Sequence, residues 1–147
     1  ASTIMDSLSY AEGNQAAVDF YLHHEAKLTE DIPDDVRYLA YFHANAAWSA
    51  IKLNDLALLG LADSCSESAF TVLPEAPEIA GTRGAYLIVT GQSEPGLALI
   101  LPALRAIDIR ADKADFCTYI AQGYQQIGRT ERADTFTALG HHLRATA

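Results

Sequence analysis

The sequence predicts an all-α fold built from stacked helical hairpins. Two observations lead to this prediction: long runs with helical periodicity, and a regular spacing of the short turns between them. No segment alternates apolar and polar residues for long enough to indicate a β-strand. The chain has 147 residues, enough for one domain with a sizeable core, and we place that single domain at residues 1–147.

Helical periodicity is clearest in residues 35–52, which contain no Gly or Pro and are rich in Ala. Small and apolar residues recur there at three- and four-residue spacing, which is typical of a helix with one buried face. Asp34 or Asp35, directly after Pro33, is a suitable residue to cap the start of this helix.

Later helices show similar start and stop signals. We expect Ser93, Asp112 and Thr130 to cap the N-termini of three helices, with Pro95 tolerated in the first turn of its helix. We expect Gly128 to end the helix that follows Asp112.

The turns between the helical runs recur at a fixed distance. They fall at Asn54-Asp55, Gly91-Gln92 and Gly128-Arg129, each 37 residues after the one before, and Gly13-Asn14 lies 41 residues before the first. Such a period, with two helices per repeat, is typical of a solenoid in which neighbouring hairpins stack to cover their apolar faces. We expect hairpins at roughly residues 3–30, 35–72, 77–108 and 112–144.

The residues at equivalent positions resemble the tetratricopeptide repeats. That family places a small residue midway along the first helix, a Gly at the turn, and small residues in the second helix. The middle hairpin carries Gly84, Leu87, Gly91, Gly96, Ile100 and Ala103 at the pattern positions. The last hairpin carries Ala121, Tyr124, Gly128, Ala133 and Gly140 there. The hairpin before them matches less well, with Ala46, Ala47, Ala50, Asn54 and Leu59.

This resemblance covers about residues 35–140 and implies a right-handed α-α superhelix, a TPR-like solenoid of three to four hairpins. The sequence departs from the family in its period, which is 37 residues instead of about 34. Arg83, Pro102 and Thr137 also stand at positions where the family places other residue types. An armadillo-type array and an unrelated helical bundle therefore stay open as alternatives.

In tetratricopeptide arrays the first helix of each hairpin lines a concave groove that holds a partner. The resemblance implies a partner-binding surface made of Tyr41, Asn45, Trp48, Lys52, Thr82, Ile88, Tyr119, Gln122 and Gln126. Family members that clamp a carboxylate terminus use basic and amide residues at certain of these positions. Ala44, Trp48 and Thr118 occupy those positions here, so we expect no such clamp.

No residue pattern in the chain indicates catalysis or metal binding. His23, His24 and Glu25 are adjacent, and neighbours on a helix point too far apart to chelate one ion. His43 lies on an apolar stripe, where we expect a hydrogen-bonded core histidine. We interpret Cys65 and Cys117 as two small buried side chains and not as a disulfide. The prediction is therefore no enzyme, no metal and no cofactor.

Charge and hydropathy restrict the partner. The net charge is −9, which disfavours nucleic acid and favours a basic or apolar protein segment. The sequence shows no signal peptide and no apolar run long enough to cross a membrane, so we expect no membrane insertion and a cytoplasmic protein.

We predict that the chain is a protein-interaction module or adaptor that binds a peptide or helix of a partner. A narrower form of this prediction is a secretion or assembly chaperone. The alternative is a structural domain of a larger protein that docks or forms a homodimer through an open helical end, where Phe136 and Leu139 lie on the last helix. The third hypothesis is a helical enzyme with a dispersed His/Glu site.

Overall fold

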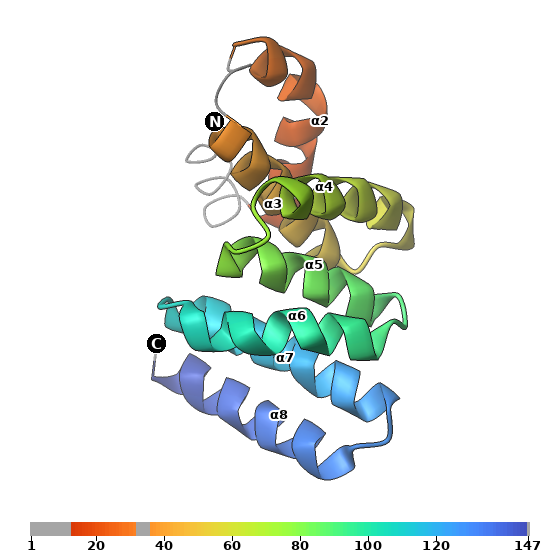
Figure 1. Ribbon diagram of the computed structural model, residues 1–147, viewed down its shortest axis with the longest axis vertical. Helices are drawn as coiled ribbons and strands as arrows, with labels where there is room; N and C mark the ends of the chain where they lie inside the picture. Colours follow the sequence, from red (N-terminus) through yellow and green to blue (C-terminus); the bar gives the residue numbers. More distant parts are fainter. Residues whose placement is uncertain (1–12, 32–35, 147) are drawn as a thin grey trace. The chain divides into compact units, whose positions relative to one another are not determined.

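A computed structural model describes residues 13–31 and 36–146, without the side chains of residues 24–31 (Figure 1). Within these ranges the chain forms helices and no β-strand, which confirms the all-α prediction. The predicted cap at Asp34 or Asp35 and most of the predicted hairpin at 3–30 lie outside the fully described residues.

The chain divides into two compact units, Ala1–Pro74 (unit 1) and Glu75–Ala147 (unit 2). They differ in charge: unit 1 holds 11 acidic and 3 basic side chains, whereas unit 2 holds 8 acidic and 7 basic ones. The net charges are therefore −8 and −1. The single domain that we predict over residues 1–147 stays a prediction.

The described part of unit 1 has a helix packed between two others. Its elements are α2 (Asn14–Asp31), α3 (Val36–Leu53), the short 3₁₀ helix η1 (Leu56–Leu58) and α4 (Leu59–Val72). α3 packs on both α2 and α4. Phe42 of α3 is fully buried and stacks on Tyr21 of α2, with ring centroids 4.8 Å apart. Small residues of α3, among them Ala46 and Ala47, let the neighbouring helices approach it closely.

Unit 2 consists of two antiparallel hairpins that pack side by side (Figure 1). Its helices are α5 (Pro77–Val89), α6 (Ser93–Ala106), α7 (Arg110–Gln126) and α8 (Thr130–Ala145). α5 pairs with α6, α7 pairs with α8, and α7 also packs on α5 and α6. The turns of both hairpins lie at the same end of unit 2, which we call the turn end.

The two turns of unit 2 repeat one backbone conformation. Gly91 and Gly128 have φ angles of +89° and +77°, in the left-handed region that favours glycine. The next amide along the chain donates five residues back in both turns: Gln92 N to Leu87 O at 2.7 Å, and Arg129 N to Tyr124 O at 2.9 Å. This six-to-one bond is the Schellman motif that satisfies carbonyls at a helix C-terminus.

The turn after α3 shares only part of this geometry. Asn54, at the equivalent position, has a φ of +52°, which Asn tolerates better than most residues. The chain then forms η1, capped by Asp55, whose carboxylate accepts from Ala57 N at 3.0 Å. The turns that we predict near residues 54, 91 and 128 are thus confirmed, and the first of them is built differently.

Glycines set the close approach of α5 to α6. A Cβ added to Gly84 would lie 2.8 Å from Gly96 O, and a Cβ on Gly96 would lie 2.7 Å from Gly84 O. Since each glycine faces the backbone of the other, neither position has room for a side chain. The two small residues at these pattern positions thus allow α5 and α6 to pack closely.

The helix starts differ from the predicted caps. The N-caps of α6 and α8 are Gln92 and Arg129, and α7 begins at Arg110 with Ile109 as its N-cap. Ser93, Thr130 and Asp112 therefore lie within the first turns of their helices. None of these three N-caps makes a side-chain capping bond.

Candidate functional site

Two of the predicted binding residues lie in the interior. Ile88 is fully buried, and its side chain fills the space beside Gly96 of α6 and Gly123 of α7. Thr82 is 5% exposed, and its hydroxyl donates to Glu78 O at 2.8 Å. The resemblance predicts that both line the concave groove, but Ile88 follows Gly81 by two helical turns and points the same way, toward α7. We therefore remove Thr82 and Ile88 from the candidate surface.

The predicted residues of α7 form one continuous stripe, which we call the α7 face. It consists of the predicted Tyr119, Gln122 and Gln126 together with Asp115 and Thr118, and each member lies three or four residues from another on the same side of the helix. Thr118, Gln122 and Gln126 are exposed, and Tyr119 and Asp115 are half-buried. Burial, and secondly the Asp115 carboxylate, raise the pKa of Tyr119 to about 12, so its hydroxyl stays neutral at physiological pH.

One arginine of α8 borders the α7 face. Its Nη2 donates to Thr118 Oγ1 at 2.9 Å and lies 3.4 Å from Asp115 Oδ1, forming an ion pair with that carboxylate. This residue, Arg144, offsets the acidic charge on the N-terminal half of the face. The remaining half, from Tyr119 to Gln126, carries no charged member and offers amide groups.

The predicted residues of α3 form a second stripe, in unit 1. Tyr41, Asn45 and Trp48 are half-buried, and Lys52 is exposed. The Lys52 ammonium lies 6.0 Å from the centroid of the Trp48 ring, at the outer limit of a cation–π contact. The stripe combines aromatic surface with a single positive charge.

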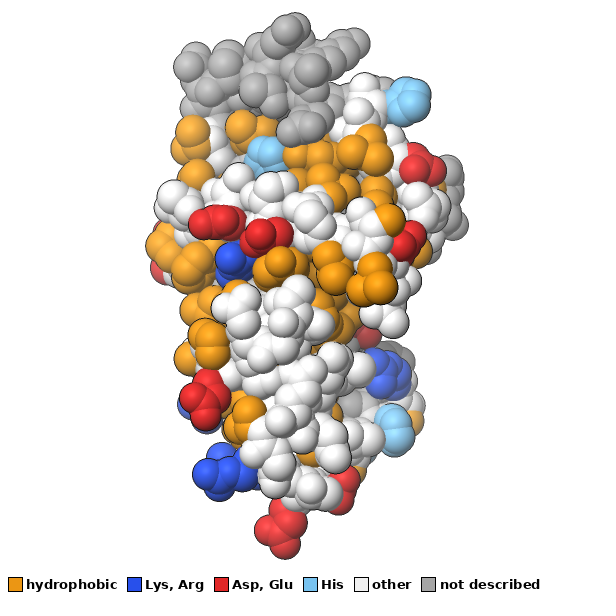
Figure 2. Space-filling model, turned by 90° about the vertical axis from the view of Figure 1, so that its right-hand side faces the viewer, with side chains coloured by type: hydrophobic (Ala, Val, Ile, Leu, Met, Phe, Trp, Pro, Cys, Tyr) orange, Lys and Arg blue, Asp and Glu red, His pale blue; other side chains and the backbone are white. Residues whose placement is uncertain are grey.

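A shallow depression at the turn end of unit 2 was not predicted. It has a volume of about 530 Å³ and lies between residues 91–95 on one side and Gln126 and Ile127 on the other. We call it the turn depression. It adjoins the α7 face, since Gln126 belongs to both. Figure 2 views unit 2 from this end and shows mainly neutral polar side chains and backbone, with charged groups toward the margins.

A hydrogen bond joins the two walls of the depression. The hydroxyl of Ser93, which is 5% exposed, donates to Oε1 of Gln126. Gln92 and Glu94 also line the depression, and Pro95 and Ile127 add apolar surface. From the sequence alone Ser93 is predicted only as a cap, because its contact with Gln126 joins residues 33 positions apart.

The remaining chemical candidates occupy structural positions. His43 is half-buried, and its Nδ1 shares a hydrogen bond of 3.0 Å with Tyr21 Oη, which confirms a satisfied core histidine. Cys65 and Cys117 are free and buried, as predicted. Burial raises the pKa of the Cys117 thiol, although Arg144 partly opposes this shift.

Neither a metal cluster nor a membrane span is found among the described residues. No group of three or more His, Cys, Asp or Glu side chains in that part of the chain could hold an ion. No described helix is both long enough and apolar enough to cross a bilayer. Comparisons with protein-family models, curated proteins and solved structures gave no match to this chain.

The last helix exposes less apolar surface than expected. Phe136 is half-buried, and its ring stacks on Tyr124 of α7 with centroids 5.7 Å apart. Leu139 is 38% exposed. Since Phe136 points into the α7–α8 interface, the apolar end that we expected for docking or dimerisation is reduced to Leu139.

Proposed function

We propose that this chain is a TPR-like helical-repeat module that binds a segment of another protein. The observation that carries the proposal is the repetition of one hairpin backbone at a 37-residue offset, seen in the φ angles and hydrogen bonds at Gly91 and Gly128. Repeated hairpins are characteristic of solenoid proteins, which bind partners along surfaces formed by successive repeats. The superhelical arrangement of the whole chain is part of this proposal.

The surface of unit 2 suits recognition better than chemistry. The α7 face and the turn depression adjoin at Gln126 and carry amides, hydroxyls, one half-buried tyrosine and the two separate carboxylates of Asp115 and Glu94. Such groups recognise the donors and acceptors of a peptide, whereas catalysis needs a nucleophile or an acid–base pair held at short range. Binding is therefore the function that these two surfaces support best.

Charge favours a basic or apolar partner. Unit 1 carries a net charge of −8, which favours a basic segment. The half of the α7 face from Tyr119 to Gln126 holds no charged side chain, so a segment that covers it need not desolvate an ion there. A chaperone for a secreted or assembling protein is the narrower form of this proposal. It rests on analogy with small acidic repeat proteins and on no single residue.

The α7 face can be tested with the full chain as bait. Chemical cross-linking in a cell lysate, followed by mass spectrometry, would recover partners of the native protein. We expect Gln122→Arg to abolish the cross-links of a specific partner, because the new cation would repel a basic segment. Ala138→Arg, at an exposed position of α8, is the matched control and should retain that partner. Equal recovery with both variants would contradict the assignment.

A further inference from the structure

We propose that the turn depression is a subsite for an extended peptide segment with a basic side chain. This inference deepens the proposed function and rests on it in one respect, namely that the ligand is a segment of a protein. The depression lies at the turn end of unit 2, and of its lining residues only Gln126 is among the nine that the sequence predicts for the binding surface.

The depression offers hydrogen-bonding groups that the protein leaves unused. Oε1 of Gln126 accepts from Ser93, so the amide nitrogen of Gln126 keeps its donors for a ligand. In the part of the chain that the structure describes, the side chains of Gln92 and Glu94 have no hydrogen-bond partner. Both residues are exposed, so their oxygens are accessible.

These groups match the backbone of an extended peptide. Such a backbone presents a carbonyl acceptor and an N–H donor from each residue, with no internal hydrogen bonds to satisfy them. The Gln126 amide can donate to a peptide carbonyl, and an oxygen of Gln92 or Glu94 can accept from a peptide N–H. Pro95 and Ile127 supply apolar contact, and Ile127 is 37% exposed.

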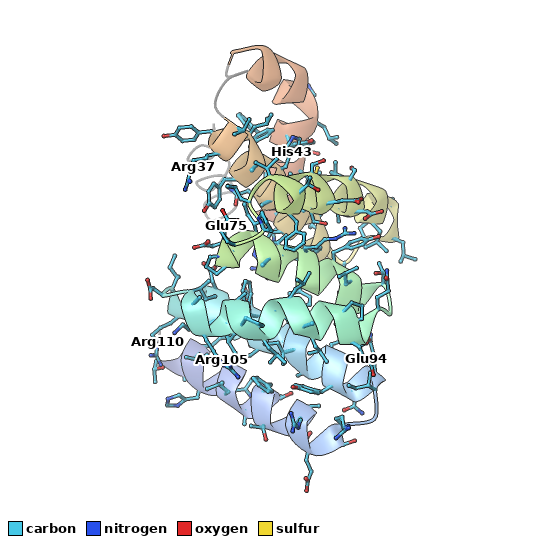
Figure 3. The ribbon with its side chains drawn as sticks, in the orientation of Figure 1. Arg37, His43, Glu75, Glu94, Arg105 and Arg110 are labelled. Atoms are coloured by element: carbon cyan, nitrogen blue, oxygen red, sulfur yellow. The ribbon has the colours of Figure 1, made fainter. Side chains whose placement is uncertain are left out.

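Charge selects the side chain of the ligand. Glu94 is the only charged residue in the lining of the depression, and Figure 3 shows it at the turn end, far along the helices from Arg105 and Arg110. Arg129 is the basic residue nearest in sequence to the lining residue Ile127, which it follows by two positions, and it does not line the depression. An arginine or lysine of the ligand would thus meet Glu94, whereas an acidic residue there would be repelled.

The second turn of unit 2 provides an internal control. Glu131 lies 37 residues after Glu94, on the same backbone conformation and in the first turn of α8. The end of α7, at Gln126, lies across the depression from Glu94. Among the described residues, however, no helix ends in the equivalent place beside Glu131. Replacing either glutamate removes the same charge, but only Glu94 belongs to the depression.

The experiment is an NMR titration of the ¹⁵N-labelled full chain with three capped tripeptides, Ala-Arg-Ala, Ala-Gln-Ala and Ala-Glu-Ala, to about 10 mM. We expect the arginine peptide to shift the amide signals of Gln92, Ser93, Glu94, Gln126 and Ile127. Its affinity should exceed that of the glutamine peptide about two- to fivefold, the range of one exposed ion pair. Glu94→Gln should abolish this preference, and Glu131→Gln should preserve it.

Two results would overturn the inference: no shifts at the depression with any peptide, or equal shifts with the arginine and glutamate peptides. A third informative result is a shift confined to Tyr119 and Gln122. It would place the peptide on the α7 face alone, so the subsite would be wrong while the proposed function would stand. Recovery of no specific cross-linked partner with the full wild-type chain would count against the proposed function itself.

Discussion

The hairpins α5–α6 and α7–α8 have the same backbone conformation at their turns, but their second helices carry different side chains. Leu97 and Ile100 of α6 are buried, and Leu97 packs against Gly123 of α7. The equivalent residues of α8, 37 positions later, are Asp134 and Thr137, and both are exposed. The same helix position is thus an apolar contact in one hairpin and a polar surface in the next.

This difference separates two roles of the sequence. Glycines at the turns fix the backbone, so the hairpin can repeat without its side chains repeating. The side chains of the second helix then determine whether another helix can pack on it. α6 accepts α7, whereas the polar outer face of α8 disfavours self-association through that surface.

The largest predicted effect concerns the helix contact, where the hairpins differ most. Gly84→Ala should destabilise the protein by about 1–3 kcal/mol, because the added methyl meets Gly96 O and Ile100. The loss should occur even though Ala favours a helix by about 1 kcal/mol over Gly. Urea unfolding followed by circular dichroism measures the change.

Ala121, which is equivalent to Gly84, supplies the matched control. It already carries a buried methyl group, so Ala121→Gly should cost about 2 kcal/mol, from the poorer helix propensity of Gly and the loss of that methyl. If Gly84→Ala instead stabilised the protein, α5 and α6 would not approach as closely as the structure shows.

The turns should respond alike, because their backbones agree. Gly91→Ala and Gly128→Ala should each cost about 1–2 kcal/mol, since both glycines have positive φ and neither faces a neighbouring atom within 4 Å. Gly91→Asn should cost less, as Asn54 adopts positive φ at the equivalent position. Thermal unfolding of the three variants checks this, and unequal losses at the two turns would show that their conformations differ.

The hydrogen bond between the hairpins should have a smaller effect. Ser93→Ala leaves Gln126 Oε1 without its donor and should cost about 1 kcal/mol. Thr130→Ala, at the equivalent exposed position, should change stability by less than about 0.5 kcal/mol. Denaturant titration distinguishes these outcomes. If Ser93→Ala and Thr130→Ala lowered stability equally, the Ser93 hydroxyl would contribute only through its position at the start of a helix and not through its bond to Gln126.

Ionisation of Tyr119 should appear at alkaline pH. The pKa of Tyr119 is raised in the folded state. The neutral hydroxyl therefore makes its full contribution to the free energy of unfolding below the ordinary tyrosine pKa of about 10. That contribution is lost as the pH rises from about 10 through about 12. The difference in absorbance near the tyrosinate band between the wild type and Tyr119→Phe should therefore titrate near pH 12. A midpoint near 10 would show that Tyr119 is solvated.

The sequence was sufficient for the helices and the turns. Glycine or asparagine at positions 54, 91 and 128 marks backbone that other residues avoid, and its regular spacing implies repetition. The α7 face could also be predicted, because residues three and four apart must share one side of a helix.

The rest depends on contacts between distant residues. The inward position of Ile88 follows from how α6 and α7 pack, which no local pattern reveals. Phe136 could not be assigned to the interior without knowing that Tyr124 lies beside it. The turn depression needs the end of α7 to lie against the α5–α6 turn, and only the packed hairpins bring Ser93 to Gln126.

Amide hydrogen exchange of the full chain tests most directly whether one hairpin backbone occurs twice. The amides of Gln92 and Arg129 donate to Leu87 and Tyr124 in equivalent turns. We predict that both exchange slowly and with similar protection, although the side chains around them differ. Rapid exchange at one of the two, with protection at the other, would contradict the repeated scaffold on which the proposed function depends.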